Sequence, residues 1–245
     1  MKKITSLLLF LVLILMISVS CKNNDNDLPD PTAEGTVIDV VGNVYKTVKI
    51  GDQVWMAENL KTTKYKDATS ISYLADSTAW KNSTNGAYCI NDTINDICQV
   101  LYNWHAVNTG KLAPKGWHVA TDADWSTLEN YLISAGLNYD GTTKDNKIAK
   151  SLASDTIWAV STVEGNIGKY LLINNISGFS ALPCGIRGIN TTGQFRNFGM
   201  YGYWWTSNEC NSETAWTRSL FYNMSGINRI NFGKTDGMSV RCVKN

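Results

Sequence analysis

The sequence predicts an α+β protein, with an antiparallel sheet and two to three short helices preceded by an N-terminal β-meander. Helical spacing of apolar residues is confined to the middle of the chain, between about residues 101 and 152. From Ser180 onward the apolar residues instead recur with a period of two, and turns rich in Asn, Ser, Gly and Asp separate them. Helices in the middle followed by strands indicate an α+β domain with an antiparallel sheet.

The first 20 residues have the features of a secretion signal. Two lysines precede the apolar run Leu7–Ile17, which is too short to span a bilayer. Cys21 follows the small residue Ser20 and resembles the lipobox cysteine of bacterial lipoproteins, whose acylated thiol becomes the mature N-terminus. Ser18 stands where a lipobox usually has an aliphatic residue, so ordinary secretion is the alternative. We expect a signal peptide over 1–20 and a lipid anchor at Cys21, in the outer membrane or at the cell surface.

Residues 21–35 are polar, acidic and proline-bearing, which predicts a flexible tether spanning roughly 20 Å. Residues 36–245 would then form one large domain. Removal of residues 1–20 takes away two lysines and changes the formal net charge from +1 to −1. A near-neutral chain without a basic block argues against nucleic acid as a partner.

Three strands are predicted at the start of the domain. Thr36–Val40 and Val44–Ile50 flank a hairpin turn at Gly42, and Gln53–Met56 follows a second turn at Gly51–Asp52. These strands form the predicted meander. The stretch from Lys61 to Asp96 is polar and predicted to be irregular.

A turn, a short strand and a helix start then follow one another directly. Pro114–Gly116 predicts the turn, and Trp117–Val119 the strand. Thr121 is the predicted helix cap, with Asp124 at capping-box spacing, and Gly136 ends the helix. Trp117 and the helical Trp125 are expected in the core, where they join sheet to helix.

Two further helices and four further strands complete the prediction. The helices are Leu101–Val107, with Leu101 and Trp104 directed inward, and Lys144–Leu152. The strands are Tyr201–Thr206, Ala215–Tyr222, Gly226–Phe232 and Met238–Val243.

Five cysteines remain after Cys21, and pairing is expected in an oxidising compartment. Cys89 and Cys98 bracket a polar loop and are predicted to form a disulfide. An odd number leaves at least one thiol free or paired between chains. The absence of a C-x-x-C motif argues against a zinc ribbon.

Five motifs carry a family resemblance. They are GNVYKTVKIGDQVWMAENL (42–60), LYNWHAV (101–107), GWHVATDADW (116–125), GYWWTSNE (202–209) and SVRCV (239–243). From residue 36 to the end the chain resembles the Fibrobacter succinogenes major paralogous domain family, found on many envelope lipoproteins. The resemblance implies a C-type-lectin-like fold, shared with formylglycine-generating enzymes, and no general activity. Family members usually carry, at the position of Ala113, a cysteine that pairs near the C-terminus; here Cys184 or Cys210 could replace it as partner of Cys242.

The candidates for catalysis and metal binding are few, and no cofactor or enzymatic activity is expected. Two histidines, His105 and His118, are too few for zinc and are expected to be structural. Calcium needs six to eight oxygens. Its candidate ligands Asn208, Glu209 and Asp236 lack a lectin-type Glu-Pro-Asn loop, which favours solvated loop residues.

Two enzyme hypotheses follow from composition and resemblance. Cys184, Cys210 and Cys242 could supply thiolates for copper, as the resemblance to formylglycine-generating enzymes implies, but a disulfide is favoured in this compartment. A Ser–His–acid triad lacks a nucleophile motif to mark its serine.

The aromatic residues suggest a binding surface. One of Trp204 and Trp205 must face the core, and the other could stack on sugar or protein, although packing on both faces is the simpler interpretation. Trp204, Trp205, Asn208 and Glu209 are the candidate ligand-binding residues. The predicted protein is a cell-envelope lipoprotein whose lectin-like domain binds a glycan or a protein. The alternatives are an oxidoreductase of the formylglycine-generating type and a structural surface protein.

Overall fold

The computed structural model describes residues 35–91, 98, 100–188 and 193–245. The expected signal peptide, Cys21 and the tether up to residue 34 lie outside the described residues. Among those described, no helix is both long and apolar enough to cross a bilayer.

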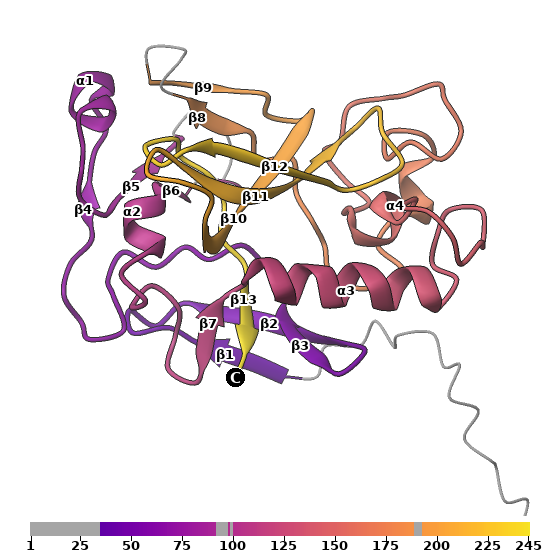
Figure 1. Ribbon diagram of the computed structural model, residues 1–245, viewed down its shortest axis with the longest axis horizontal. Coiled ribbons are helices and arrows are strands. Elements are labelled where there is room, and N and C mark those ends of the chain that lie inside the picture. The colour runs from indigo at the N-terminus through magenta and orange to yellow at the C-terminus, as the bar shows by residue number, and fades with distance from the viewer. Residues whose placement is uncertain (1–34, 92–97, 99, 189–192) are drawn as a thin grey trace, which may run out of the picture.

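The two ends of the domain share one antiparallel sheet (Figure 1). Its C-terminal strand lies between the meander and the strand that precedes the long helix, because Val243 pairs with Trp55 on one side and His118 on the other. The meander is therefore an integral part of the main sheet and not a separate preceding unit. In spatial order the strands are β1 (Gly35–Ile38), β2 (Val44–Ile50), β3 (Gln53–Met56), β13 (Cys242–Lys244) and β7 (Trp117–Val119).

A second antiparallel sheet contains three of the predicted late strands, β10 (Tyr201–Glu209), β11 (Thr214–Phe221) and β12 (Asn228–Gly233). The register of β10 against β11 shifts between Trp205 and Glu209. The fourth predicted strand is shorter than expected: β13 begins at Cys242, while Met238 and Ser239 form only isolated bridges, to Tyr102 and Trp204.

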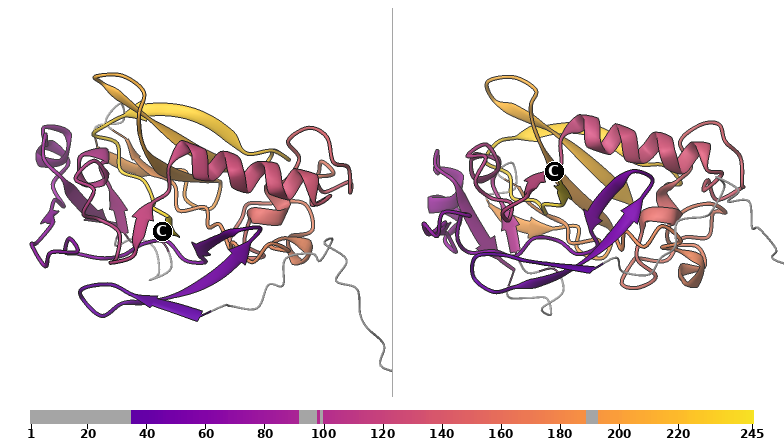
Figure 2. Two further views of the ribbon diagram at one scale, coloured as in Figure 1. Left: turned by 60° about the horizontal axis from the view of Figure 1, so that its bottom comes forward. Right: turned by 90° about the horizontal axis from the view of Figure 1, so that it is seen from below.

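The helix α3 (Asp122–Ser134) connects the two sheets (Figures 1 and 2). The predicted capping box is confirmed: Asp124 N donates to Thr121 Oγ1 over 3.0 Å, and Thr121 N donates to Asp124 Oδ2 over 2.8 Å. The helix ends as predicted at Gly136, whose φ of 72° suits glycine. One core cluster joins α3 through Trp125, Leu128 and Leu132 to residues of β2, β3, β10 and β11.

Only one of the two tryptophans expected to join sheet and helix is fully in the core. Trp125 is completely buried, and its ring centroid lies 5.1 Å from that of Trp55 and 6.2 Å from that of Trp204. Trp117 is partly exposed, because β7 is the edge strand of its sheet, and it packs on the second core cluster.

Two predicted helices are shorter than expected. Residues 100–102 join a strand, so α2 covers only Trp104–Val107, and Asn103 Oδ1 caps it by accepting from Ala106 N over 3.1 Å. The other is reduced to α4 (Ala149–Leu152), since Asp145 has a left-handed φ of 62° and Asn138 Nδ2 donates to Lys144 O over 2.9 Å.

The stretch predicted to be irregular, together with neighbouring segments, holds small elements at one end of the molecule. They are β4 (Ser72–Tyr73), α1 (Ser77–Lys81), β5 (Ala87–Ile90) and β6 (Val100–Tyr102), with the hairpin β8 (Ile186–Gly188) and β9 (Gln194–Arg196) nearby. A 3-10 turn, η1 (Leu171–Ile173), follows α4. The α+β class is thus confirmed.

Candidate functional site

Trp204 and Trp205 are both core residues, so the predicted stacking platform is wrong. Each has a relative exposure of 0 %. Trp204 Nε1 donates to Asn59 Oδ1 over 2.9 Å, and Trp205 Nε1 donates to Tyr102 O over 2.9 Å. Neighbouring residues of a strand point to opposite faces, and a separate core cluster covers each face of β10.

Asn208 and Glu209 are exposed but already have partners. Asn208 Oδ1 accepts from Asp122 N over 2.7 Å at the start of α3, and Glu209 forms an ion pair with Lys234. The four predicted ligand-binding residues therefore do not form one site. Within the described ranges, no group of three or more His, Cys, Asp or Glu side chains is placed to hold a metal ion.

The two histidines lie on different elements. His118 Nε2 lies 2.9 Å from Asp124 Oδ2, and its Nδ1 lies 2.8 Å from Asn245 Oδ1. His105 belongs to α2, where burial lowers its pKa.

The disulfide joins Cys98 to Cys184, with the two Cα atoms 5.0 Å apart, and the predicted Cys89–Cys98 pair is wrong. Cys89 is a free, buried thiol in β5, opposite Leu101 in β6. All three cysteines belong to one core cluster, so the fold brings a residue 86 positions away next to Cys98.

Neither proposed replacement pairs with Cys242. Cys184 is bonded to Cys98, and Cys210 and Cys242 are free. Burial raises the pKa of Cys242 well above its usual range. The residue belongs to the same core cluster as Ala113.

A polar pocket of about 500 Å³ is the candidate site that the sequence did not reveal. It lies between the β2–β3 side of the main sheet and the two segments around residues 155 and 178. Its lining residues are Val44, Lys46, Ala57, Glu58, Asn59, Lys61, Ser154, Asp155, Thr156, Asn175, Ser180 and Leu182.

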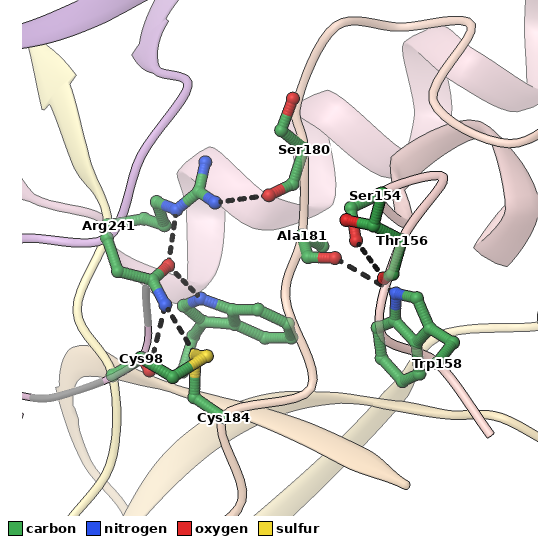
Figure 3. Close-up of a disulfide and its surroundings, with 11 residues drawn as sticks. Cys98, Ser154, Thr156, Trp158, Ser180, Ala181, Cys184 and Arg241 are labelled. Carbon is green, nitrogen blue, oxygen red and sulfur yellow. Dashed lines mark hydrogen bonds between the residues drawn. A yellow bond between two sulfur atoms is a disulfide. The ribbon is translucent and has the colours of Figure 1, made fainter. Parts of the chain in front are cut away.

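Asn59 ties the pocket wall to the C-terminal part of the fold. Its Oδ1 accepts from Arg241 Nε over 2.7 Å as well as from Trp204 Nε1. Its Nδ2 donates to Ser239 Oγ over 3.0 Å and to Cys184 Sγ over 3.3 Å. Figure 3 shows Arg241 and the disulfide in this region. A carboxamide with its donor and acceptor groups used in this way is held in one orientation.

Arg241 is a fully buried cation next to the pocket (Figure 3). Its guanidinium donates to Met56 O over 2.8 Å, to Phe179 O over 2.6 Å and to Ser180 O over 2.9 Å. Burial lowers the pKa of Arg241 to about 9, so the group remains charged at neutral pH. No carboxylate of the described chain lies within ion-pair distance of it, but the pocket carboxylate Glu58 interacts with it electrostatically and opposes the lowering of its pKa.

Two residues with left-handed backbone conformations shape the opposite wall. Asn175 has a φ of 67° and Ser180 a φ of 56°. Asn175 Oδ1 accepts from Ser180 N over 2.7 Å, and Asn175 Nδ2 donates to Ser180 Oγ over 2.8 Å. Such conformations persist where the surroundings fix them, and they are frequent at ligand sites.

Four charged side chains line the pocket, and one of them, Glu58, interacts electrostatically with the buried Arg241. Lys46, Glu58, Lys61 and Asp155 form neither an ion pair nor a side-chain hydrogen bond with any described residue; Lys61 Nζ lies 6.0 Å from the centre of the Tyr45 ring. Their donors and acceptors are therefore available to a ligand, and the pocket offers charges of both signs.

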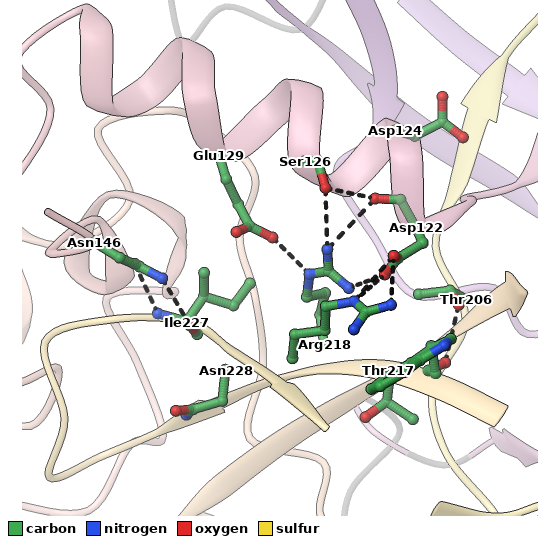
Figure 4. A network of polar contacts seen from close by, with 12 residues as sticks. Asp122, Asp124, Ser126, Glu129, Asn146, Thr206, Thr217, Arg218, Ile227 and Asn228 are labelled. Atoms are coloured by element: carbon green, nitrogen blue, oxygen red, sulfur yellow. Dashed lines mark hydrogen bonds and ion pairs between the residues drawn. The ribbon is translucent and has the colours of Figure 1, made fainter. Parts of the chain in front are cut away.

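A second polar network, around Arg218, has a structural role (Figure 4). Arg218 Nε donates to Glu129 Oε1 over 2.6 Å and its guanidinium pairs with Asp122, while Arg229 pairs with Asp122 over 2.9 Å. Burial raises the pKa of Glu129, and Arg218 opposes that shift. Since these residues come from α3, β11 and β12 and satisfy one another, the network fixes the helix on the sheet.

The fold and the pocket define an α+β domain with a charged cavity. The chain belongs to the Fibrobacter succinogenes major domain family, which it matches over residues 48–244. No curated protein and no solved structure matches it.

Proposed function

We propose that this protein is a lipid-anchored protein of the cell envelope whose domain, residues 36–245, binds an extracellular glycan in the pocket beside Asn59. A C-type-lectin-like fold is part of this proposal. Support comes from the family match, the signal-like N-terminus ending at Cys21, and the pocket itself.

The observation that carries the proposal is the set of unpaired polar groups around the cavity. Binding sites hold a few well-placed polar groups that fix the orientation of the ligand. Two ammonium groups and two carboxylates, on Lys46, Lys61, Glu58 and Asp155, can both donate to and accept from sugar hydroxyl groups. Hydrogen bonds of Asn59 and Asn175 preorganise parts of the two walls, which lowers the entropic cost of binding.

The oxidoreductase alternative has no observation in its favour. Copper binding in the formylglycine-generating manner would need paired thiolates. Cys184 is bonded to Cys98, and Cys242 is a buried thiol with a raised pKa.

A glycan array probed with the mature chain, starting at position 21 and carrying Cys21→Ser, tests the binding proposal. We expect Lys61→Ala and Glu58→Gln to weaken binding of the selected glycan about tenfold or more, because each loses a charged hydrogen bond. Asn208→Ala and Glu209→Gln are the controls and should bind like the parent. Loss of binding in the controls but not in the pocket variants would place the ligand elsewhere.

Lipidation at Cys21 is tested by cell fractionation. Cys21→Ser should move the protein from the detergent phase to the soluble fraction, because it removes the acylated thiol. Equal partitioning of the parent and the variant would refute the anchor, whatever the result of the glycan array.

A further inference from the structure

The loops that follow α4, which lies at the right of Figure 1, carry several large exposed apolar side chains. Leu172 has a relative exposure of 91 %, Ile173 of 62 %, Tyr170 of 61 % and Val163 of 60 %. Single exposed apolar residues are ordinary, but a group of them marks an interaction surface.

A hollow of about 240 Å³ lies among these loops, and Ile173 is the one of these four side chains that lines it. Tyr139, Glu164, Ile173 and Ile176 all line that hollow. A Cβ atom at Gly165 would lie only 2.3 Å from the Tyr139 ring, so this ring rests directly on the loop that carries Val163. We call Tyr139, Val163, Tyr170, Leu172, Ile173 and Ile176 the apolar rim.

The apolar rim is held rigidly. Lys150 of α4 is buried, and its Nζ donates to Asn166 O over 3.3 Å and to Lys169 O. Asn174 Nδ2 donates to Ser154 O over 3.1 Å. Left-handed conformations at Tyr170, with a φ of 55°, and at Asn175 bracket η1, so the backbone directs Leu172 outward.

We propose that the apolar rim inserts into the surface of a lipid bilayer, an inference that rests on the proposed lipid anchor. Thirteen residues separate Cys21 from Gly35, where β1 begins, and the tether expected there from the sequence would span roughly 20 Å. An anchored domain on so short a tether stays at the membrane, where a second, weak apolar contact adds to the first.

The chemistry of the rim suits the interface between headgroups and acyl chains. The rim combines exposed aliphatic side chains with the aromatic rings of Tyr139 and Tyr170, and Lys169 Nζ lies 4.4 Å from the centre of the Tyr170 ring. Tyrosine and lysine are the residues that anchor proteins at this depth, because each combines an apolar body with a polar end.

The test uses the mature chain with Cys21→Ser, which carries no acyl group, and vesicles of phosphatidylethanolamine and phosphatidylglycerol. The described residues contain the core clusters, so this chain keeps its fold. Because the contact is weak without the anchor, we expect part of the parent to sediment when lipid is in large excess, and the double variant Leu172→Asp, Ile173→Asp to bind at least fivefold less. The matched control, Val40→Asp with Val41→Asp on the β1–β2 turn, should bind like the parent. A parent that does not bind, or equal losses in both variants, would overturn the proposal.

A second measurement reports insertion directly. In a Cys210→Ser background, where the other free thiols Cys89 and Cys242 are buried, Leu172→Cys is labelled with an environment-sensitive dye. Its emission should shift to the blue on vesicles, and that of a labelled Val40→Cys should not. A parent dimer that Leu172→Asp dissociates, with no shift on vesicles, would assign the rim to a second copy and refute membrane contact. Since the assay needs no acyl group, its failure is distinguishable from failure of the anchor.

Discussion

The side chain of Asn59 connects distant parts of the fold, and this role could not be predicted from the sequence. It stands in a polar stretch after β3, yet its carboxamide connects Arg241, Trp204, Ser239 and Cys184, which lie far away in the sequence. The sequence left open whether Trp204 or Trp205 is exposed or both are packed, because alternation along a strand says which face a side chain points to and not what covers that face. Here both faces of β10 are covered.

Asn59→Ala should lower the free energy of unfolding by about 2–4 kcal/mol. The variant leaves Arg241 Nε and Trp204 Nε1 without an acceptor, and each buried group left unsatisfied costs about 1–3 kcal/mol. Urea unfolding followed by tryptophan fluorescence gives the value. Asn85→Ala, at an exposed loop position where the side chain forms no hydrogen bond with a described residue, should change it by less than about 0.5 kcal/mol. Equal stability of the two variants would mean that the Asn59 hydrogen bonds contribute nothing net.

At the scale of the element, strong local sequence signals, such as turn residues and helix caps, predicted the bounds of strands and helices correctly. The strands β2 and β3 have the predicted bounds, and the cap and the end of α3 are as predicted. The helix predicted over 144–152 is limited to α4, because the Asn138 side chain binds the backbone of the preceding residues and Asp145 adopts a left-handed conformation. Helical periodicity does not register such competing side-chain hydrogen bonds.

Asp124 makes the stability of α3 dependent on pH. Burial acts to raise its pKa, but hydrogen bonds from Thr121 and His118 outweigh that effect and leave the pKa below its ordinary value. A depressed folded-state pKa contributes stability above the unfolded pKa, and this contribution is lost as the pH falls through the folded value. Asp124→Asn should therefore destabilise the protein at pH 7, and the difference from the parent should shrink as the pH falls below about 4. Thermal unfolding at pH 7 and pH 3 measures both differences; a constant difference would refute the role of the carboxylate charge.

Replacing Trp117 or Trp125 by Ala should lower the free energy of unfolding by different amounts. Trp125→Ala empties the centre of the cluster formed with Trp55, Phe179 and Trp204, and should cost roughly 3–5 kcal/mol. Trp117→Ala should cost roughly half as much, because that side chain is already partly exposed on an edge strand. Denaturant unfolding of both variants decides the order. A larger loss at Trp117 would contradict the assignment of Trp125 to the core centre.

At the scale of the whole molecule, distant segments meet in ways that sequence spacing does not indicate. The pocket combines residues 44–61, most of which fall within the family motif 42–60, with residues 154–182, which carry no motif, so no single stretch of sequence contains the whole site. The disulfide likewise joins two segments that are distant in the sequence. The polar loop between Cys89 and Cys98 suggested a local disulfide. The pairing of β5 with β6 instead places Cys89 opposite Leu101, and Cys98 forms its disulfide with Cys184.

The Cys98–Cys184 bond should therefore stabilise the molecule more than a local bridge would. Its sequence separation is 86. In the chain-entropy model, closing a loop of that length lowers the free energy of folding by about 4–5 kcal/mol, against roughly 2–3 kcal/mol for the short loop expected from sequence. Cys184→Ser and Cys98→Ser should each lose most of this stability. Cys89→Ala removes one buried sulfur and should cost about 1 kcal/mol.

Peptide mapping without reducing agent, combined with urea unfolding before and after reduction, checks this assignment. The parent should yield a cross-linked peptide containing Cys98 and Cys184, and reduction should lower its stability to that of Cys184→Ser. Cys184 Sγ also accepts from Asn59 Nδ2 beside the pocket, so the loss of the bond should weaken ligand binding as well as folding. A Cys89–Cys98 peptide, or a Cys184→Ser variant as stable as the parent, would contradict the pairing and its role in joining the small sheets to the pocket wall.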